Sequence, residues 1–506
     1  MTPAGHQPVG VHSLAVPQQL LDGDHQRGAL TLRVFVEADV TFEWGRAAWA
    51  STIGIAISVI GVSGCVHYVP KPLDLPVTNA SLDARTLSDP ALRQVIESAA
   101  VGQPSPDVFD LPALTVAALY YQPDLEVARA NWALARAGIQ TAGERANPTV
   151  AAGPGYNSTT PAHTITPWIL NLNVDFTLET AGKRGYRIDQ ARRLSESARF
   201  TVADTAWAVR SRVRQALLDL FSATASADVL TRQQGVQESN VTLLQRQLAA
   251  GAISTFEMTQ ARLTLSGIRL ALLEAQRQAQ DARARLATAI GVPVAALDAV
   301  RLRLDPFASV TGDIAARPLT REALVNRADV LRALSDYDAS QSALQLEIAR
   351  QYPDVHLGPG YQMDQSSNKW TILAPFVLPA FSRNRGPIAQ ADARRSVAAA
   401  QVTAVQAQAI GRVDRAFAAY QSARNTLATA DQLLVDGRSL EATAQNQLAA
   451  GEISQLDLGL IQSERASREL ARLSALVQVQ QAVGDIEDAM QRPIDLPINP
   501  LPENPQ

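Results

Sequence analysis

Gln247-Leu-Ala-Ala-Gly-Ala-Ile-Ser254 is the stretch that decides the fold of this chain of 506 residues. It recurs 200 residues later, with one substitution, as Gln447-Leu-Ala-Ala-Gly-Glu-Ile-Ser454. Gly251 and Gly451 hold the position just after a helix, where a left-handed backbone favours glycine. Both stretches are therefore predicted to be tight turns that each join two helices.

The residues after each glycine predict where the next helix begins. Ser254 precedes Glu257 by three residues, and Ser454 precedes Asp457 by the same interval. This spacing is that of a capping box, in which serine and the acidic side chain each accept a hydrogen bond from the other's backbone N–H. Helices are therefore predicted over about 254–290 and 454–491.

The stretches before the two turns, 186–250 and 388–450, contain no proline and can form uninterrupted helices. Small and apolar residues recur in them at spacings of four and three, the pattern of a coiled-coil seam. The first seam comprises Val202, Ala206, Val209, Val213, Ala216, Leu220, Ala223 and Ala227. The second comprises Val402, Ala409, Val413, Ala416, Tyr420 and Ala423, with Gln406 as a polar exception. Helices of about 70 residues would be about 100 Å long, too long for a globular domain.

Shorter amphipathic helices are predicted upstream, over about 114–147 and 319–352. The first opens with a Leu-Thr…Ala-Leu…Asp pattern that recurs 205 residues later in the second. The two halves of the chain are therefore predicted to be copies of one unit, in which one long helix lies beside two shorter ones placed end to end.

A β-hairpin is predicted in each half, between the short helix and the long one. Residues 170–178 alternate strictly between apolar and polar, which indicates a strand with one face of each kind. The polar face, predicted to line a lumen, comprises Asn171, Asn173, Asp175 and Thr177. The matching strand over 370–378 contains Pro375, which suggests a bend or an edge. Strands over 149–156 and 354–361 would pair with these two through loops of about 8 to 10 residues.

Four strands are too few to close a barrel, and an open sheet edge in lipid leaves backbone groups without hydrogen bonds. The chain is therefore expected to oligomerise, and three copies would supply twelve strands. The predicted fold is mainly α with a small β part: a two-fold repeat of long coiled-coil helices and two β-hairpins. It would trimerise into an α-barrel tunnel topped by a twelve-stranded transmembrane β-barrel.

Composition excludes several classes of function. The chain has 45 Lys and Arg against 49 Asp and Glu, so it lacks the basic excess that nucleic-acid binding requires. Its six histidines are scattered and it has a single cysteine, so no metal site or other cofactor is predicted. No Ser/His/Asp set or Gly-rich phosphate loop occurs, and the protein is predicted not to be an enzyme.

The single cysteine, Cys65, follows a segment typical of an export signal. An apolar run of small residues over 47–61 follows Arg46, and Val62-Ser-Gly-Cys65 resembles the bacterial lipobox, whose cysteine is lipidated. An uncleaved membrane anchor and a buried free thiol are the alternatives. Because 45 residues precede Arg46, the true start of translation is expected downstream of Met1.

Together these features resemble the TolC-type outer-membrane efflux channel family, from about Leu111 to Pro493. The doubled opening motif at 114–125, the strand insertions and the tip turns carry the resemblance. It implies a homotrimer that spans the outer membrane, contacts its lipids and extends a helical tunnel into the periplasm. The implied partners are a periplasmic adaptor (membrane fusion) protein and an inner-membrane pump of the resistance-nodulation-division type.

The resemblance also implies roles for the tip turns. The residues expected to dock the adaptor are Gly251, Ser254, Gly451 and Ser454. Glu257 and Asp457 would narrow the tunnel with rings of carboxylates, although helix capping alone is an equal alternative for both.

Two finer motifs, at 178–187 and 378–386, resemble the CzcC-like branch of the family, which implies export of divalent metal cations. The alternatives are drug efflux, type I protein secretion, or a lipid-anchored periplasmic coiled-coil scaffold without a pore. The scaffold would explain the heptads and Cys65 but not the hairpins. Lys183, Arg184 and Arg187 are expected to lie at the membrane boundary and to pair with lipid phosphates or Glu179.

The expected organisation has six parts, and residues 1–64 are the first, a signal-peptide region. The others are a lipidated linker at 65–110, a first repeat at 111–300, an inter-repeat linker at 301–318, a second repeat at 319–493 and a tail at 494–506.

Overall fold

The structure is a computed structural model that describes residues 66–99, 108–159, 166–310 and 326–494. Cys65 and the predicted signal region lie outside the described residues. Residues 66–85 belong to a separate unit, in which helix α3 (Leu75–Asp83) begins after Asp74. The Asp74 carboxylate accepts a hydrogen bond from the backbone N–H of Val77 at 3.4 Å.

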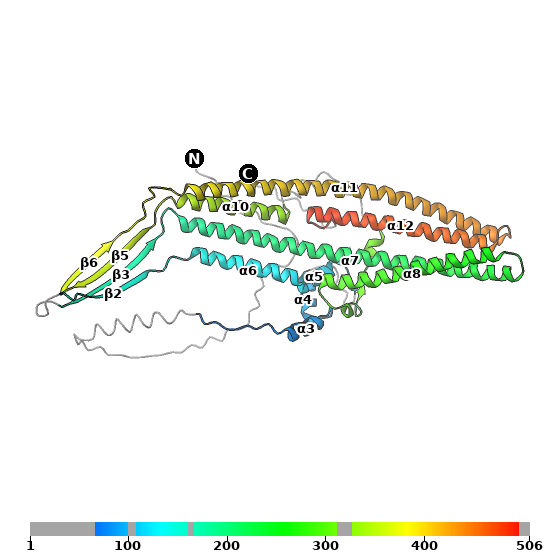
Figure 1. Cartoon of the computed structure of the whole chain (residues 1–506). Helices are drawn as coiled ribbons and strands as arrows, with labels where there is room; N and C mark the ends of the chain where they lie inside the picture. Colours follow the sequence, from blue (N-terminus) through cyan, green and yellow to red (C-terminus); the bar gives the residue numbers. More distant parts are fainter. Residues whose placement is uncertain (1–65, 100–107, 160–165, 311–325, 495–506) are drawn as a thin grey trace. The chain divides into compact units, whose positions relative to one another are not determined.

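The main unit is built on two long helices, α7 (Lys183–Ala249) of 67 residues and α11 (Arg385–Ala449) of 65 residues. Helix α8 (Thr255–Ile290) folds back along α7, and α12 (Gln455–Met490) folds back along α11, as Figure 1 shows. The predicted long helices and the helices that follow the tip turns are therefore confirmed.

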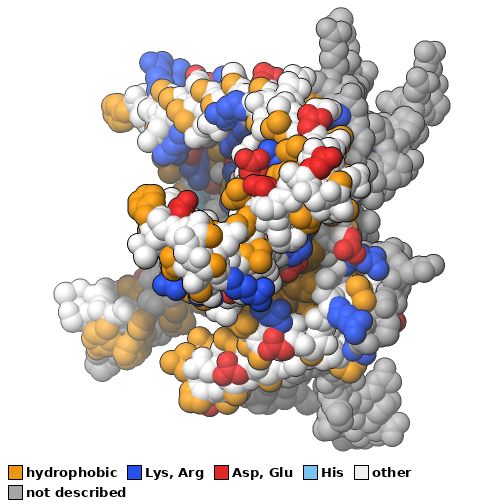
Figure 2. All heavy atoms as spheres, turned by 90° about the vertical axis from the view of Figure 1, so that its right-hand side faces the viewer, with side chains coloured by type: hydrophobic (Ala, Val, Ile, Leu, Met, Phe, Trp, Pro, Cys, Tyr) orange, Lys and Arg blue, Asp and Glu red, His pale blue; other side chains and the backbone are white. Residues whose placement is uncertain are grey.

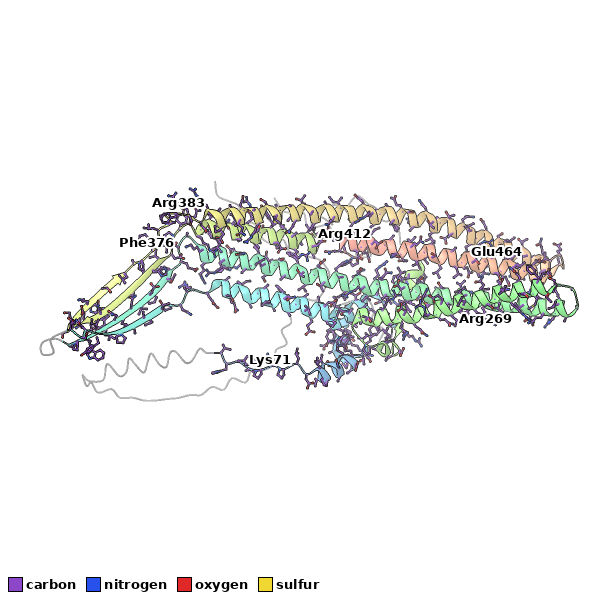
Figure 3. The ribbon with its side chains drawn as sticks, viewed as in Figure 1. Lys71, Arg269, Phe376, Arg383, Arg412 and Glu464 are labelled. Carbon is purple, nitrogen blue, oxygen red and sulfur yellow. The ribbon has the colours of Figure 1, made fainter. Side chains whose placement is uncertain are left out.

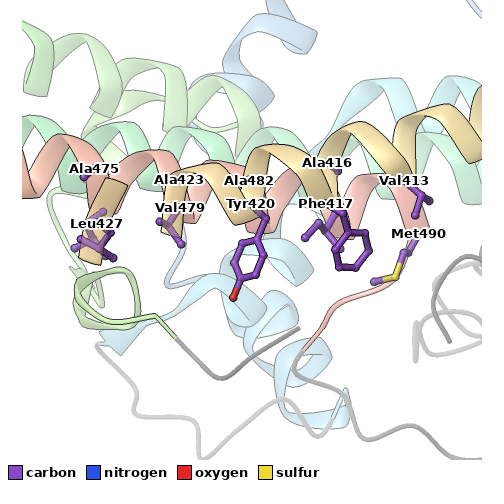
Figure 4. Close-up of a cluster of buried hydrophobic side chains, with 13 residues drawn as sticks. Val413, Ala416, Phe417, Tyr420, Ala423, Leu427, Ala475, Val479, Ala482 and Met490 are labelled. Atoms are coloured by element: carbon purple, nitrogen blue, oxygen red, sulfur yellow. The ribbon is translucent and has the colours of Figure 1, made fainter. Parts of the chain in front are cut away.

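The predicted seams form much of the core. In α7 all the seam residues are buried except Ala227, which is half-buried. In α11 the seam contributes Val413 and Tyr420 to an apolar cluster with Val479 and Ile486 of α12 (Figure 4). Many of these positions hold alanine, so the helices can approach one another closely.

The first short helix is divided, and the prediction of one helix over 114–147 is wrong. The structure has α5 (Leu111–Tyr121) and α6 (Pro123–Gly143), separated by Gln122 in an extended conformation. Pro123 lacks a backbone N–H and disfavours a helical conformation in the residue before it, so the chain breaks there. In the second half, α10 (Ala328–Ala349) lies within the predicted range.

Small elements that were not predicted lie beside α5 and the ends of α8 and α12. They are α4 (Pro90–Ser98), the parallel pair β1 (Val108–Phe109) and β4 (Arg301–Leu302), and the 3-10 turns η1 (Val294–Leu297) and η2 (Asp305–Ala308).

The two hairpins form one antiparallel sheet in the order β2-β3-β5-β6. Its strands are β2 (Thr149–Tyr156), β3 (Trp168–Leu178), β5 (Val355–Asp364) and β6 (Ser367–Leu373). Strands β2 and β6 are the two edges.

The second hairpin departs from the prediction at two points. Its turn has only two residues, Gln365 and Ser366, with φ of 49° and 77°, instead of about 8 to 10. Its outer strand ends at Leu373, before Pro375, because proline has no N–H for the ladder. None of the helices described is long and apolar enough to cross a membrane.

Candidate functional site

The sheet has one polar face and one apolar face. Residues paired across neighbouring strands lie on the same face. Asn171 is paired with Gln362, and Gln362 with Lys369, so the polar face continues across three strands. The opposite face carries apolar side chains from all four strands: Val150, Leu170, Leu172, Phe176, Tyr361, Trp370 and Ile372. The predicted set Asn171, Asn173, Asp175 and Thr177 lies on the polar face.

A histidine that sequence reasoning missed lies on this polar face. His356 pairs with Thr177 across β3 and β5, and its Nδ1 is 2.9 Å from Oδ2 of Asp175 and 3.4 Å from the Thr177 hydroxyl. The sequence offers no clear signal for this contact, because which residues of β3 face His356 depends on the register of β3 with β5. No cluster of three or more His, Cys, Asp or Glu able to hold a metal ion occurs in the part of the chain that the structure describes.

Basic side chains fix the junction between the sheet and α7. Arg187 makes two hydrogen bonds to the Glu179 carboxylate, at 2.6 and 3.2 Å, so the predicted partner of this arginine is confirmed. Its Nε also donates to the carbonyl oxygen of Ala142, and Arg184 Nε donates to that of Gly143, both at 2.7 Å. These cations therefore satisfy the last carbonyl groups of α6.

Lys183 connects the same junction to the second hairpin. Its Nζ lies 2.7 Å from both the carbonyl oxygen of Tyr352 and Oδ1 of Asp354. Asn384 is the N-cap residue of α11, as Gly182 is of α7, and its side chain donates to the carbonyl oxygen of Glu347 at 2.7 Å.

The tip turns have the predicted geometry. Gly251 and Gly451 have φ of 72° and 76°, which only glycine adopts without strain. The N–H of Glu257 donates to the Ser254 hydroxyl at 3.3 Å, and the N–H of Ser254 donates to the Glu257 carboxylate at 2.7 Å. In the second turn the same two bonds between Ser454 and Asp457 measure 3.2 and 2.9 Å. Figure 2 views this end of the molecule and shows acidic, basic and apolar side chains intermixed on it.

The capping boxes predict a pH dependence at the tips. The backbone N–H of Ser254, and then its hydroxyl, hold the pKa of the Glu257 carboxyl below its usual value. Because this pKa is depressed, the ionised carboxylate stabilises the turn at pH values above 4.5, the usual pKa of the group. This contribution is lost as the pH falls through the folded-state pKa. Hydrogen exchange of tip peptides, corrected for intrinsic rates, should therefore accelerate in acid. Glu257→Gln keeps a capping side chain but cannot titrate, so an unchanged acid response in this variant would contradict the assignment.

A buried ionic network joins α7 to α12, and sequence reasoning missed it. Glu487 is 4% exposed and accepts two hydrogen bonds from Arg210, at 3.0 and 3.1 Å. Arg214 Nε lies 3.3 Å from the same carboxylate, and Arg214 also donates to the carbonyl oxygen of Gln480 at 2.8 Å. Burial lowers the pKa of Arg214, and the Glu487 carboxylate opposes that effect. A Cβ at Gly484 would overlap the Arg214 guanidinium, so glycine provides its space.

Two buried side chains join the shorter helices end to end. Gln122 Nε2 donates to the carbonyl oxygen of Ala289 at 2.9 Å, near the end of α8. Arg327, which is 1% exposed, donates to that of Ala489, near the end of α12. An aspartate two residues after each donor forms an ion pair with a long helix. Asp124 pairs with Arg212 at 2.8 Å, and Asp329 pairs with Arg412, labelled in Figure 3, at 3.6 Å.

Known proteins similar to this chain are transport proteins of bacteria. The cobalt-zinc-cadmium resistance protein CzcC of Cupriavidus metallidurans is 27% identical over 289 residues, which are 54% of this chain and 62% of CzcC. This match therefore spans less than two thirds of that relative. The pyoverdine export outer membrane protein OpmQ of Pseudomonas putida is 25% identical over 352 residues, 63% of this chain and 71% of OpmQ.

Among solved structures, the outer membrane protein VceC of Vibrio cholerae has the same fold, with a TM-score of 0.62. It is 20% identical, and the match covers 75% of this chain and 95% of VceC.

A family model described as outer membrane efflux protein matches the chain twice, over residues 114–292 and 319–490. The two matches include both tip turns, both hairpins and all four helices that form the tips. The predicted resemblance to outer-membrane efflux channels is thereby confirmed, and since these are transport proteins the chain is not an enzyme. The chain belongs to the outer membrane efflux protein family.

Proposed function

We propose that this protein is the outer-membrane channel of a tripartite efflux system. It would conduct solutes passively from an inner-membrane pump, which we expect to be of the resistance-nodulation-division type, and a periplasmic adaptor to the exterior. The direction of transport would be set by the energised pump, because the channel itself is proposed to be passive.

The observation that carries the proposal is the four-stranded sheet with its two unlike faces. Strands β2 and β6 have no partner beyond them among the described residues, and the apolar face is exposed at Trp370 and Ile372. In a membrane, such a sheet must close so that no backbone group remains unpaired. Three copies would give a barrel of twelve strands, with the polar face around Asn171 and Asn173 toward the lumen.

Two further features support an internal duplication of the chain. Its long helices would extend the barrel into a helical tunnel. The family model matches twice, and the matched ranges lie within the proposed repeats 111–300 and 319–493. Gln122 and Arg327 cap equivalent carbonyl groups, 200 residues apart, and the ion pairs of Asp124 and Asp329 are equivalent in the same way. The long helices of three such duplicated chains would form a cylinder with six similar sectors.

The remaining assignments concern the lipid anchor and the tip turns. We propose that Cys65 carries a lipid anchor, within a linker at 65–110 that follows the signal region. The tip residues Gly251, Ser254, Gly451 and Ser454 would dock the adaptor. Glu257 and Asp457, whose pKa values are held below their usual values by hydrogen bonds from Ser254 and Ser454, could also form acidic rings at the tip.

For the cargo we propose divalent metal cations. CzcC is named for resistance to cobalt, zinc and cadmium, and the polar face carries the Asp175 carboxylate. The name of OpmQ, an exporter of pyoverdine, favours an organic cargo as the second candidate.

The proposal is tested by deleting the gene and measuring growth inhibition by a panel of divalent metals and hydrophobic drugs. We expect sensitisation to metals, restored by the intact gene but not by one that lacks both hairpins. Sensitisation to drugs alone would favour an organic cargo. Stepwise conductance of the purified protein in planar bilayers is expected as well, and its absence would favour a scaffold without a pore.

A further inference from the structure

A histidine and a carboxylate form a pair on the polar face of the sheet, at the end that leads to the long helices. His356 lies near the start of β5 and Asp175 near the end of β3, and the His356 Nδ1 is 2.9 Å from the Asp175 Oδ2. Their side chains are 35% and 29% exposed, so both reach the open surface of this face. The next two residues of β5 on the same face, Gly358 and Gly360, have no side chains that could cover the imidazole.

The contact with Asp175 orients the imidazole of His356. An ionised carboxylate only accepts hydrogen bonds, so Nδ1 carries the proton that it donates to Asp175. In the neutral ring the lone pair is then on Nε2, which makes no hydrogen bond to any residue that the structure describes. Histidines that bind metal ions have this arrangement, in which a carboxylate holds one ring nitrogen and leaves the other as a ligand.

The charges around the pair favour a cation. Among the residues of the four strands, the other carboxylate belongs to Asp364, and Lys369 pairs with it at 2.6 Å. At the junction with α7, Lys183 pairs with Asp354 at 2.7 Å. Each of these lysines is thus balanced by its own carboxylate, whereas Asp175 contacts an imidazole without a charge. The polar face therefore carries an uncompensated negative charge beside His356, which attracts cations.

We propose that His356 and Asp175 form a transient binding site in the lumen for divalent cations such as Zn²⁺ and Co²⁺. The ligand is Nε2 of His356, and Asp175 is the positioning residue. Imidazole favours ions of this class over Mg²⁺ and Ca²⁺, which prefer oxygen ligands. This inference rests on the proposed channel and names the residues by which its lumen would recognise a metal cargo.

The site is suited to passage of the ion and not to its retention. The described residues contain no cluster of three or more His, Cys, Asp or Glu able to hold a metal ion, so water would fill most coordination positions. A conducting pore requires binding that is favourable enough to admit the ion and weak enough to release it. A closed set of four protein ligands, as in structural zinc sites, would instead retain the ion.

The effect of zinc on the potassium current tests the site. The full-length protein is placed in planar bilayers, and zinc chloride or magnesium chloride is added at equal concentrations. We expect zinc to reduce the current more than magnesium does, because bound zinc adds positive charge to the lumen wall. In His356→Gln this zinc effect, measured relative to the variant's own current, should be lost. Asp175→Asn should raise the half-maximal zinc concentration about 10- to 100-fold.

Two further variants separate a metal ligand from a merely structural side chain. His356→Cys supplies a thiolate, another ligand of zinc, and should restore the zinc effect. His67→Gln is the matched control, because it removes an exposed imidazole from the separate unit at 66–85, and should keep the zinc effect. Equilibrium dialysis of the detergent-solubilised protein against radioactive zinc should show one bound ion per chain fewer in His356→Gln than in His67→Gln.

The outcomes separate this inference from the proposed function. Channels that conduct but respond equally to zinc and magnesium, or that keep the zinc effect in His356→Gln, would overturn the site while leaving the channel proposal in place. Absence of conductance in the unmodified protein would contradict the proposed channel. The dialysis would still decide the site, because equal zinc binding by His356→Gln and His67→Gln would overturn it.

Discussion

Glu487→Ala is expected to lower the free energy of unfolding by about 3–5 kcal/mol, the usual cost of removing one partner from a buried ion pair. Arg210 and Arg214 would lose the carboxylate that they share, although these residues are only 8% and 6% exposed, respectively. Two neighbouring cations of α7 would then be left at the contact with α12 without the carboxylate that both of them contact. The measurement is the midpoint of denaturant unfolding in detergent, monitored by the circular dichroism signal of the helices.

Glu464→Ala is the matched control on the same helix. Glu464, which is labelled in Figure 3, pairs with Arg468 at 2.8 Å, and 64% of the Glu464 side chain is exposed. Because the Glu464 carboxylate is largely exposed to water, we expect its pair with Arg468 to contribute only about 1 kcal/mol. Equal losses in the two variants would contradict the role of the network. Replacing Arg210, Arg214 and Glu487 together by apolar residues of similar volume should restore most of the stability, because the buried carboxylate and both of its arginine partners are then removed together.

The sequence predicts the helices well because their signals are local. The absence of proline over 186–250 and the glycine and serine of each tip turn act within a few residues, and the structure has both features as predicted. The break at Pro123 carried an equally local signal that the amphipathic pattern obscured. The two-residue turn at Gln365 and Ser366 was harder to predict, since neither residue is a glycine or an asparagine.

The buried network could not be predicted, because its partners are far apart in sequence. Arg210 and Glu487 are 277 residues apart, and only the packing of α7 on α12 brings them together. Taken alone, the arginines resemble solvent-exposed residues beside an alanine seam. On the sheet, strict alternation was enough to predict which side chains of β3 share the polar face, whereas the contact of His356 with Asp175 depends on the register of β3 with β5.

Leu172→Arg is expected to destabilise membrane insertion by about 2–4 kcal/mol if the apolar face contacts lipid, as observed for charged residues near the bilayer midplane. Leu172 lies in the middle of β3 on the apolar face and is 43% exposed. The measurement is the fraction of protein recovered as folded trimer from outer-membrane preparations.

Asn171→Arg is the control, because it places the same side chain one residue away on the opposite face. A one-residue step along a strand reverses the face, so this guanidinium would point into the proposed lumen. We expect normal insertion and a lower ratio of cation to anion permeability in planar bilayers, since three added positive charges would surround the axis. Loss of insertion in Asn171→Arg but not in Leu172→Arg would mean that the sheet faces the membrane with its polar side, and the proposed barrel would be wrong.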